Sequence, residues 1–368
     1  MAGKKERNTT VDIVKAILIL GIAFYHLVYR KQNGIIDFGI QALVYLAIPL
    51  FFFLSGYFYR HDSKWFDPMI KRIRRVSIPE ALFVTGSLII LAPYFWLVHG
   101  YTLHQWASDV ITTFLRPEFT AMILPDYSNV GTLFNNLSMI WYIWTLVFAT
   151  MLLYVVAHFT GETDWKIITA SMILIAVGAV LYVNLPALSW SLTNVPVYTG
   201  IMLLGFLMSK YKVIDKITKI KLVPAVLIMI VTAVLHLLIY KYIGYDQTYR
   251  SVYSHTIDYP ATFFFVIQTF IGGYSILTFA RLISLVKPAE KALSWVGRHT
   301  SVILVTHCII GGIAADIMQT YNKPGPNWYV DPLTAETVIK SIISFIVAIA
   351  GSIGIALMND KIKSKTQK

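Results

Sequence analysis

The sequence predicts an all-α polytopic membrane protein with about ten transmembrane helices and both termini in the cytoplasm. Of its 368 residues, 57% are hydrophobic and only 14% are charged, whereas about a quarter of an average soluble domain is charged. The apolar residues also occur in runs of about 17–25, the length that crosses the hydrocarbon core of a bilayer. This composition excludes a soluble globular fold.

Ten apolar segments follow one another along the chain, each near the length that a bilayer requires. The first five are expected at 11–29, 37–59, 76–98, 138–158 and 165–183. The other five are expected at 196–209, 221–242, 259–283, 299–318 and 335–358. The sixth is short, so its helix is expected to tilt differently or to begin a few residues earlier. The chain is accordingly divided into a cytoplasmic segment at 1–10, a single transmembrane domain at 11–358 and a basic cytoplasmic tail at 359–368.

The positions of lysine and arginine predict the orientation. With the N-terminus in the cytoplasm, 23 of the 31 basic residues fall in inner segments and six in outer segments. Such an excess on the cytoplasmic side is the usual signature of membrane topology. The net charge of +12 therefore reflects topology rather than binding to nucleic acid.

Several chemistries are not expected from this sequence. The single cysteine, Cys308, excludes an intrachain disulfide and lies in an apolar run, where a buried small hydrophobe is expected. The nine histidines show no H-x-x-x-H spacing, so no metal site is predicted. A serine hydrolase lacks support because the G-x-S-x-G motif is missing.

The first predicted helix carries three ionisable residues, Asp12, Lys15 and His26. At about 100° per residue, His26 lies roughly 20° around the axis from Lys15 and roughly 40° from Asp12 in the other sense. All three therefore share one stripe, and Lys15 lies about 16 Å along the axis from His26. Ionisable residues inside a membrane usually face an internal path or site. Two structural alternatives remain open: a helix-end ion pair with Lys15 snorkelling to the headgroups, and a packing role for His26.

This helix is similar to the first-helix signature of the acyltransferase-3 family, in which a basic residue is followed ten residues later by histidine. The run Asp12-Ile13-Val14-Lys15, followed by His26, carries the resemblance. The basic residue is commonly arginine in the family, and lysine also occurs in the branch that includes sugar O-acetylases. Lysine keeps the charge but loses the planar fork of arginine.

Four further segments resemble family motifs in the same order. They are the FFFLSGY run at 51–57, the basic run at 71–75 followed by Ile78-Pro79, the WYIW run at 141–144, and the segment at 301–307 that ends in histidine. The resemblance spans about residues 7–355. One departure is Glu80, where the family usually has an aromatic or apolar residue, so local substrate contacts are expected to differ.

The resemblance implies candidate site residues beyond the first helix, each with an alternative explanation. Arg72, Arg74 and Arg75 are candidates for binding donor phosphates, although the positive-inside rule alone would produce such a cluster. Three candidates for lining the substrate site are Ser55, Trp141 and His307. Ser55 could equally serve close helix packing, Trp141 an aromatic belt, and His307 a structural polar contact.

The resemblance implies a membrane O-acyltransferase that moves an acyl group, expected to be acetyl, from acyl-coenzyme A to a hydroxyl of a glycan or lipid-linked sugar. Acetyl-coenzyme A would be a co-substrate, no cofactor is expected, and the location would be a bacterial plasma membrane. His26 would act as general base, and Asp12 and Lys15 would order the cytoplasmic half of the path. A covalent acyl-histidine intermediate is an alternative chemistry. A transporter or flippase for a polysaccharide or lipid-linked sugar is the alternative function.

Overall fold

The computed structural model describes residues 8–28, 35–62, 64–100, 102–115, 140–184, 188–244, 259–318 and 335–366. The regular elements of these segments are helices. The N-terminal half contains α1 (Thr9–Leu27), α2 (Ile35–Tyr57), α3 (Phe66–His99), α4 (Leu103–Leu115), α7 (Ile140–Thr160) and α8 (Asp164–Asn184). The C-terminal half contains η2 (Ser189–Asn194), α9 (Val195–Lys210), α10 (Val213–Thr218), α11 (Leu222–Ile239), η3 (Tyr240–Gly244), α13 (Tyr259–Ile283), α14 (Lys287–Arg298), α15 (Thr300–Ile317) and α16 (Ala335–Thr366).

The prediction of an all-α polytopic membrane protein is confirmed. Within the described segments, eight helices are long and apolar enough to cross a membrane, or nine if α14 and α15, which are bent by 77° at their junction, count as one span. The predicted span at 76–98 is the later part of the longer helix α3. The predicted tail at 359–368 continues α16 as helix up to Thr366. We call the end of α1 with Asp12 the inner end and the end with His26 the outer end, following the orientation that the basic residues predict.

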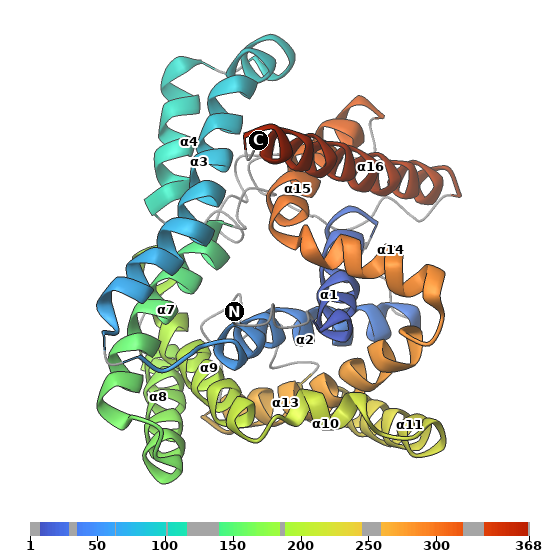
Figure 1. Ribbon diagram of the computed structural model, residues 1–368. Helices are drawn as coiled ribbons and strands as arrows, with labels where there is room; N and C mark the ends of the chain where they lie inside the picture. Colours follow the sequence, from blue (N-terminus) through green and yellow to red (C-terminus); the bar gives the residue numbers. More distant parts are fainter. Residues whose placement is uncertain are drawn as a thin grey trace.

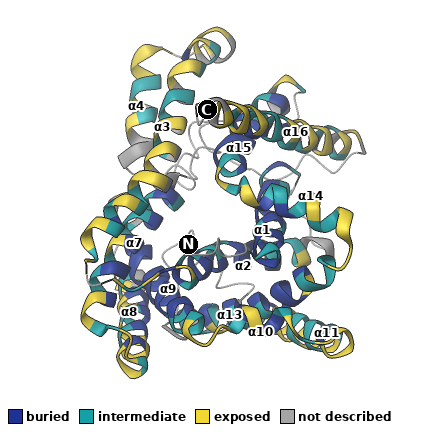
Figure 2. Ribbon diagram, viewed as in Figure 1, coloured by how far each residue is buried: buried dark blue, intermediate teal, exposed yellow. Residues whose placement is uncertain are grey.

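The most buried spanning helices are α1, α2, α9 and α13, and α2 packs against the other three (Figure 1). We call these four the central helices. In Figure 2, buried residues predominate on these central helices, whereas α3, α11 and α16 carry many exposed residues. The exposed side chains of α11 and α16 are large and apolar, such as Val223, Leu227 and Ile346. Exposed apolar residues are expected where a helix faces lipid. The exposed apolar faces of α11 and α16 are therefore expected to lie against lipid.

Glycine allows the backbones of α2 and α9 to touch. A methyl group added at Gly56 of α2 would lie 1.9 Å from the carbonyl oxygen of Met202, and one at Gly205 of α9 would lie 2.3 Å from that of Phe53. Small residues permit such close approach between membrane helices, where packing rather than the hydrophobic effect drives association. The Ser-Gly pair at 55–56 thus has a packing role through its glycine.

Polar side chains link α2 to α11 and η3. The hydroxyl of Tyr240 donates to the Gln41 side chain at 2.9 Å, and Nε2 of the buried His236 lies 3.2 Å from the carbonyl oxygen of Ala42. Both contacts join α2 to the segment formed by α11 and η3. Such bonds satisfy polar groups that lipid cannot solvate.

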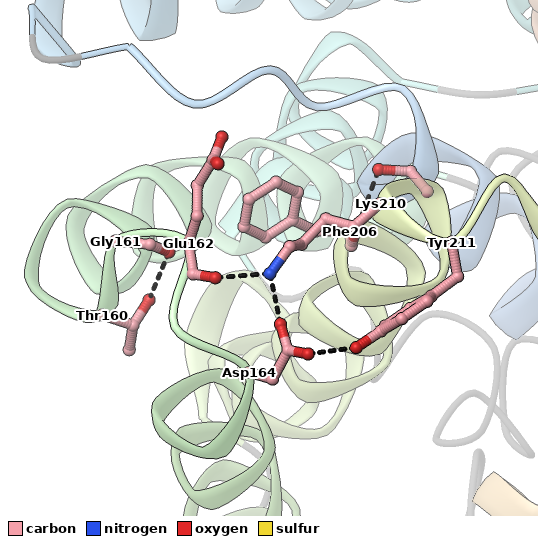
Figure 3. A network of polar contacts seen from close by, with 8 residues as sticks. Thr160, Gly161, Glu162, Asp164, Phe206, Lys210 and Tyr211 are labelled. Carbon is pink, nitrogen blue, oxygen red and sulfur yellow. Dashed lines mark hydrogen bonds and ion pairs between the residues drawn. The ribbon is translucent and has the colours of Figure 1, made fainter.

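The inner ends of α8 and α9 are joined by a polar network (Figure 3). The Lys210 ammonium contacts the Asp164 carboxylate and the Glu162 carbonyl oxygen, and the Tyr211 hydroxyl donates to Asp164. The preceding helix α7 ends at Thr160 and is followed by Gly161, whose φ of +59° lies in the left-handed region that glycine adopts without strain. The tight turn between α7 and α8 is thereby held against the end of α9.

Candidate functional site

The inner end of α1 is held directly by α14. The hydroxyl of Thr9 donates to the Glu290 carboxylate at 2.9 Å. A methyl group added at Gly297 would lie 1.7 Å from the carbonyl oxygen of Asp12, so the two backbones are in contact there. The side chain of Asp12 is only 2% exposed. The first turn of α1, which begins the predicted stripe, is therefore enclosed by protein rather than by lipid headgroups.

Two cations from different helices reach the same end of α2. The Nη2 of Arg72, on α3, donates to the Ser55 carbonyl oxygen at 2.8 Å. The Nζ of Lys15, on α1, lies 5.7 Å from the centroid of the Phe58 ring. The residues that they contact are three apart in the chain, at the C-terminal end of α2 and just beyond it. We call Lys15 and Arg72 the inner cationic pair.

Arg74 and Arg75 differ from Arg72 in their exposure. Both are exposed on α3, whereas Arg72 is half-buried. The basic run is thus divided into one arginine that is bonded to α2 and two that are free to meet a ligand from the aqueous side. Guanidinium groups bind phosphate oxygens well, so this exposed pair can extend the inner cationic pair toward the solvent.

At the outer end of α1, His26 meets His307 of α15. The centroids of the two imidazole rings are 5.7 Å apart and their planes are at 84°. His26 is half-buried and His307 is completely buried. The structure therefore brings together two histidines that are 281 positions apart in the sequence, and only His26 retains access to its surroundings.

Hydrogen bonds fix the orientation of His307. Its Nδ1 lies 2.7 Å from the carbonyl oxygen of Ile303. Because a carbonyl oxygen can only accept, this nitrogen must carry a proton. In the neutral ring Nε2 is then an acceptor, and it lies 3.2 Å from Sγ of Cys308, which can donate its S–H. The ring of His307 is thus held in one tautomer, edge to face with the ring of His26.

The two remaining predicted lining residues have structural partners. Ser55 contributes its carbonyl oxygen to Arg72. Trp141 is buried in α7, with its ring centroid 6.3 Å from that of Tyr142 and 6.5 Å from that of Tyr198. These contacts describe helix packing, and a substrate-lining role for either residue stays a prediction.

The sequence interpretation overlooked Tyr59, which follows α2. Its side chain is 3% exposed, and its hydroxyl has no hydrogen-bond partner among the described residues. Burial raises the pKa of Tyr59 to about 12, with Arg72 acting in the opposite direction. The phenol is therefore neutral near pH 7 and can donate a hydrogen bond close to the inner cationic pair. A tyrosine two residues beyond a motif that ends in tyrosine gave no distinguishing signal in the sequence.

The arrangement has two parts at different depths. The inner cationic pair lies by the end of α2, and the histidine pair lies about 16 Å farther along α1, given the rise of an α-helix. Cations at the inner end can bind an anionic group, whereas the imidazole of a histidine can accept a proton from a reacting hydroxyl. One elongated anionic ligand could contact both parts.

Comparison with known proteins identifies a family for nearly the whole chain. A family model described as an acyltransferase domain matches residues 8–357. No curated protein and no solved structure matches. The matched range includes every element from α1 to most of α16, and with it both histidines and the inner cationic pair.

Proposed function

The chain belongs to the acyltransferase-3 family and is a multi-pass membrane acyltransferase, and on that premise we propose that it moves an acetyl group from acetyl-coenzyme A to a sugar hydroxyl. The acceptor is a glycan or a lipid-linked sugar. The contact between His26 and His307 is the observation that carries the proposal, because it places a potential base in the membrane with one side accessible. The family match lends no support to the transporter alternative.

Coenzyme A suits the two-part arrangement because it is long and is charged at one end. Its phosphates would bind the inner cationic pair together with the exposed Arg74 and Arg75. Its pantetheine arm would then extend along the stripe of α1. The separation of about 16 Å between Lys15 and His26 leaves room for that arm, with the thioester near His26.

His26 is proposed as the general base. Its imidazole would take the proton of the acceptor hydroxyl while the hydroxyl oxygen attacks the thioester carbonyl. The tetrahedral intermediate then expels the coenzyme A thiolate, which takes the proton from the imidazolium. The products are an acetyl ester and coenzyme A, and His26 returns to its neutral form. His307 would hold the ring of His26 in place, since its own Nδ1 is committed to Ile303.

Asp12 and Lys15 are proposed to order the donor end. Asp12 is buried where α1 contacts α14, at the inner end from which the nucleotide part of a cytoplasmic donor would approach. Lys15, over the Phe58 ring, supplies a positive charge beside that entrance. Reaction at the outer end of α1 would allow a cytoplasmic donor to modify an acceptor on the outer side.

The proposal is tested with purified protein in nanodiscs. Acetyl-coenzyme A is added with an extract of cell-envelope glycans, and release of free coenzyme A and transfer of labelled acetyl are both measured. We expect transfer by the wild-type protein and a loss of about 100- to 10,000-fold in kcat for His26→Ala, the usual contribution of a general base. Binding of coenzyme A should persist in His26→Ala, because its phosphates bind elsewhere.

Two results would contradict the proposal. One is a folded His26→Ala protein that transfers acetyl at the wild-type rate. The other is a wild-type protein that neither binds coenzyme A nor consumes acetyl-, succinyl- or longer acyl-coenzyme A. Use of a longer donor in place of acetyl would correct the acyl group and leave the role of His26 standing.

A further inference from the structure

Three aromatic side chains form a cluster at the outer ends of α7 and α9. They are Trp144 and Phe148 of α7 and Trp190 of η2, and we call them the outer aromatic cluster. The ring centroids of Trp144 and Phe148 are 6.1 Å apart, and each of these rings is 6.2 Å from Trp190. The ring planes are within 37° of one another, so the three rings present nearly parallel faces.

The backbone of Trp190 is held in an unusual conformation. Its φ is +60°, in the left-handed region where a bulky side chain costs about 1–3 kcal/mol. An aromatic belt at the membrane surface needs no such conformation, because tryptophan serves there on an ordinary helix. Backbone strain of this kind is concentrated at functional sites. Despite its stacking, Trp190 remains 39% exposed, so part of its indole is available to a ligand.

A second observation concerns a polar atom in the cluster. The indole N–H of Trp144 is buried and has no hydrogen-bond acceptor within the described part of the chain. An indole nitrogen can only donate, and a buried donor without an acceptor costs about 1–3 kcal/mol. Two further polar side chains, Thr193 and Asn194, are buried in the same short helix η2. The cluster therefore combines aromatic faces with a donor that an oxygen atom would satisfy.

We infer that the outer aromatic cluster binds the pyranose rings of a glycan acceptor. The C–H face of a pyranose is apolar and flat enough to lie on an indole, while the hydroxyl groups around its edge accept hydrogen bonds. The aromatic rings carry no charge, so this surface suits a neutral sugar better than a phosphate or a carboxylate. The inference rests on the proposed function, since it adds to that reaction the surface on which the saccharide acceptor binds.

The position of the cluster also predicts the size of the acceptor. The main packing partners of α1 are α14, α2, α15 and α13, and Figure 1 shows α7 well separated from α1 and α15. A sugar unit on the cluster would therefore be a different unit from the one whose hydroxyl meets His26. The acceptor is then an oligosaccharide or polysaccharide rather than a free monosaccharide.

The test measures glycan binding by the full-length protein in nanodiscs, without any donor. Cellohexaose, chitohexaose and maltohexaose are titrated by calorimetry, with N-acetylglucosamine and sorbitol for comparison. We expect at least one hexasaccharide to bind more tightly than the monosaccharide. Trp190→Leu should weaken that binding about two- to ten-fold, since an aromatic stacking contact contributes about 0.5–1.5 kcal/mol. Trp190→Phe keeps a ring and should lose less.

The matched control is Trp165→Leu. Trp165 is also an exposed tryptophan, 65% accessible, but it lies at the inner end of α8. The Trp165→Leu protein should bind each hexasaccharide as tightly as the wild-type protein does. Equal binding by wild type and Trp190→Leu would overturn the inference, and so would no binding of any hexasaccharide by the wild-type protein. Either result would leave the cluster as a membrane-surface anchor.

The donor side is measured in parallel so that the two proposals can fail separately. Trp190→Leu should bind acetyl-coenzyme A with an unchanged Kd. If the wild-type protein binds the hexasaccharide through Trp190 but consumes no acyl-coenzyme A, the proposed reaction fails and the glycan site stands. If it acetylates an acceptor while Trp190→Leu retains the wild-type KM for that acceptor, the glycan site fails and the reaction stands.

Discussion

His26 of α1 and His307 of α15 meet edge to face, with their ring centroids 5.7 Å apart. The ring of His307, which is fully buried, is held by the Ile303 carbonyl oxygen and by the thiol of Cys308. A base that must take a proton at one defined nitrogen benefits from such a support, because loss of orientation alone slows a reaction. The pair thus consists of two rings with different tasks. His26 is half-buried and can react, and His307 is fully buried and can hold His26 in place.

His307→Phe tests this support. Phenylalanine can keep the ring contact with His26 but loses the hydrogen bond to Ile303. We expect kcat to fall up to about a hundred-fold, the effect of a misplacement of about 1 Å, with little change in the KM for acetyl-coenzyme A. The pH profile of kcat should also shift, because His26 would lose a polar neighbour. An unchanged pH profile and kcat would contradict a positioning role.

Cys308→Ala is the matched control for that variant. It removes the thiol that contacts Nε2 of His307 and leaves both imidazoles in place. We expect less than about a three-fold change in kcat, since a thiol is a weak donor. A loss as large as that of His26→Ala would instead indicate that the thiol takes part in the chemistry.

The stripe on the first helix could be predicted from the sequence, but its partners could not. The spacing of Asp12, Lys15 and His26 follows from helical geometry alone. The contact of His26 with His307 joins α1 to α15, helices that are far apart in the sequence, and no local pattern encodes it. The short helix α14 was not predicted either. Its apolar and charged residues lie on opposite faces of a helix, and this helical period in the sequence could have indicated it.

The helix α3 shows why a hydropathy pattern finds a span rather than a helix. The expected span begins at 76, after the basic run, because charged residues are unfavourable in lipid. The helix begins ten residues earlier, at Phe66, since lysine and arginine are good helix formers. The sequence indicated the basic cluster, but only the fold determines that Arg72 turns toward Ser55 while Arg74 and Arg75 remain exposed.

Substitutions at Lys15 distinguish a role in donor binding from a role in membrane anchoring. Lys15→Arg should keep most activity, whereas Lys15→Met should raise the KM for acetyl-coenzyme A markedly, because a cation near the donor phosphates would be lost. The measurement is the KM for acetyl-coenzyme A beside that for its 3′-dephospho form. Equal activity of the two variants would favour snorkelling, in which the charge only reaches the headgroups.

The arginines of α3 should divide into two classes. Arg72→Met should lower thermal stability, because removing a charged hydrogen-bond donor costs about 1.5–3 kcal/mol and leaves the Ser55 carbonyl oxygen without it. Arg74→Met with Arg75→Met should leave stability unchanged and weaken donor binding in a salt-dependent way, since both are exposed. Equal loss of stability in both variants would contradict this division.

Two glycines of α2 provide a matched test of the helix packing that carries the inner end of the site. A methyl group at Gly56 would lie 1.9 Å from the Met202 carbonyl oxygen, whereas nothing lies within 4 Å of one at Gly39. Gly56→Ala must therefore push α2 away from α9 and disturb the segment from Ser55 to Phe58, which the inner cationic pair contacts. We expect a fall of several degrees in Tm and a raised KM for acetyl-coenzyme A. Gly39→Ala should be neutral or stabilising by up to about 1 kcal/mol, because alanine favours a helix over glycine. Similar melting curves for both variants would show that α2 and α9 do not pack through their glycines, and the position of Arg72 would then need another explanation.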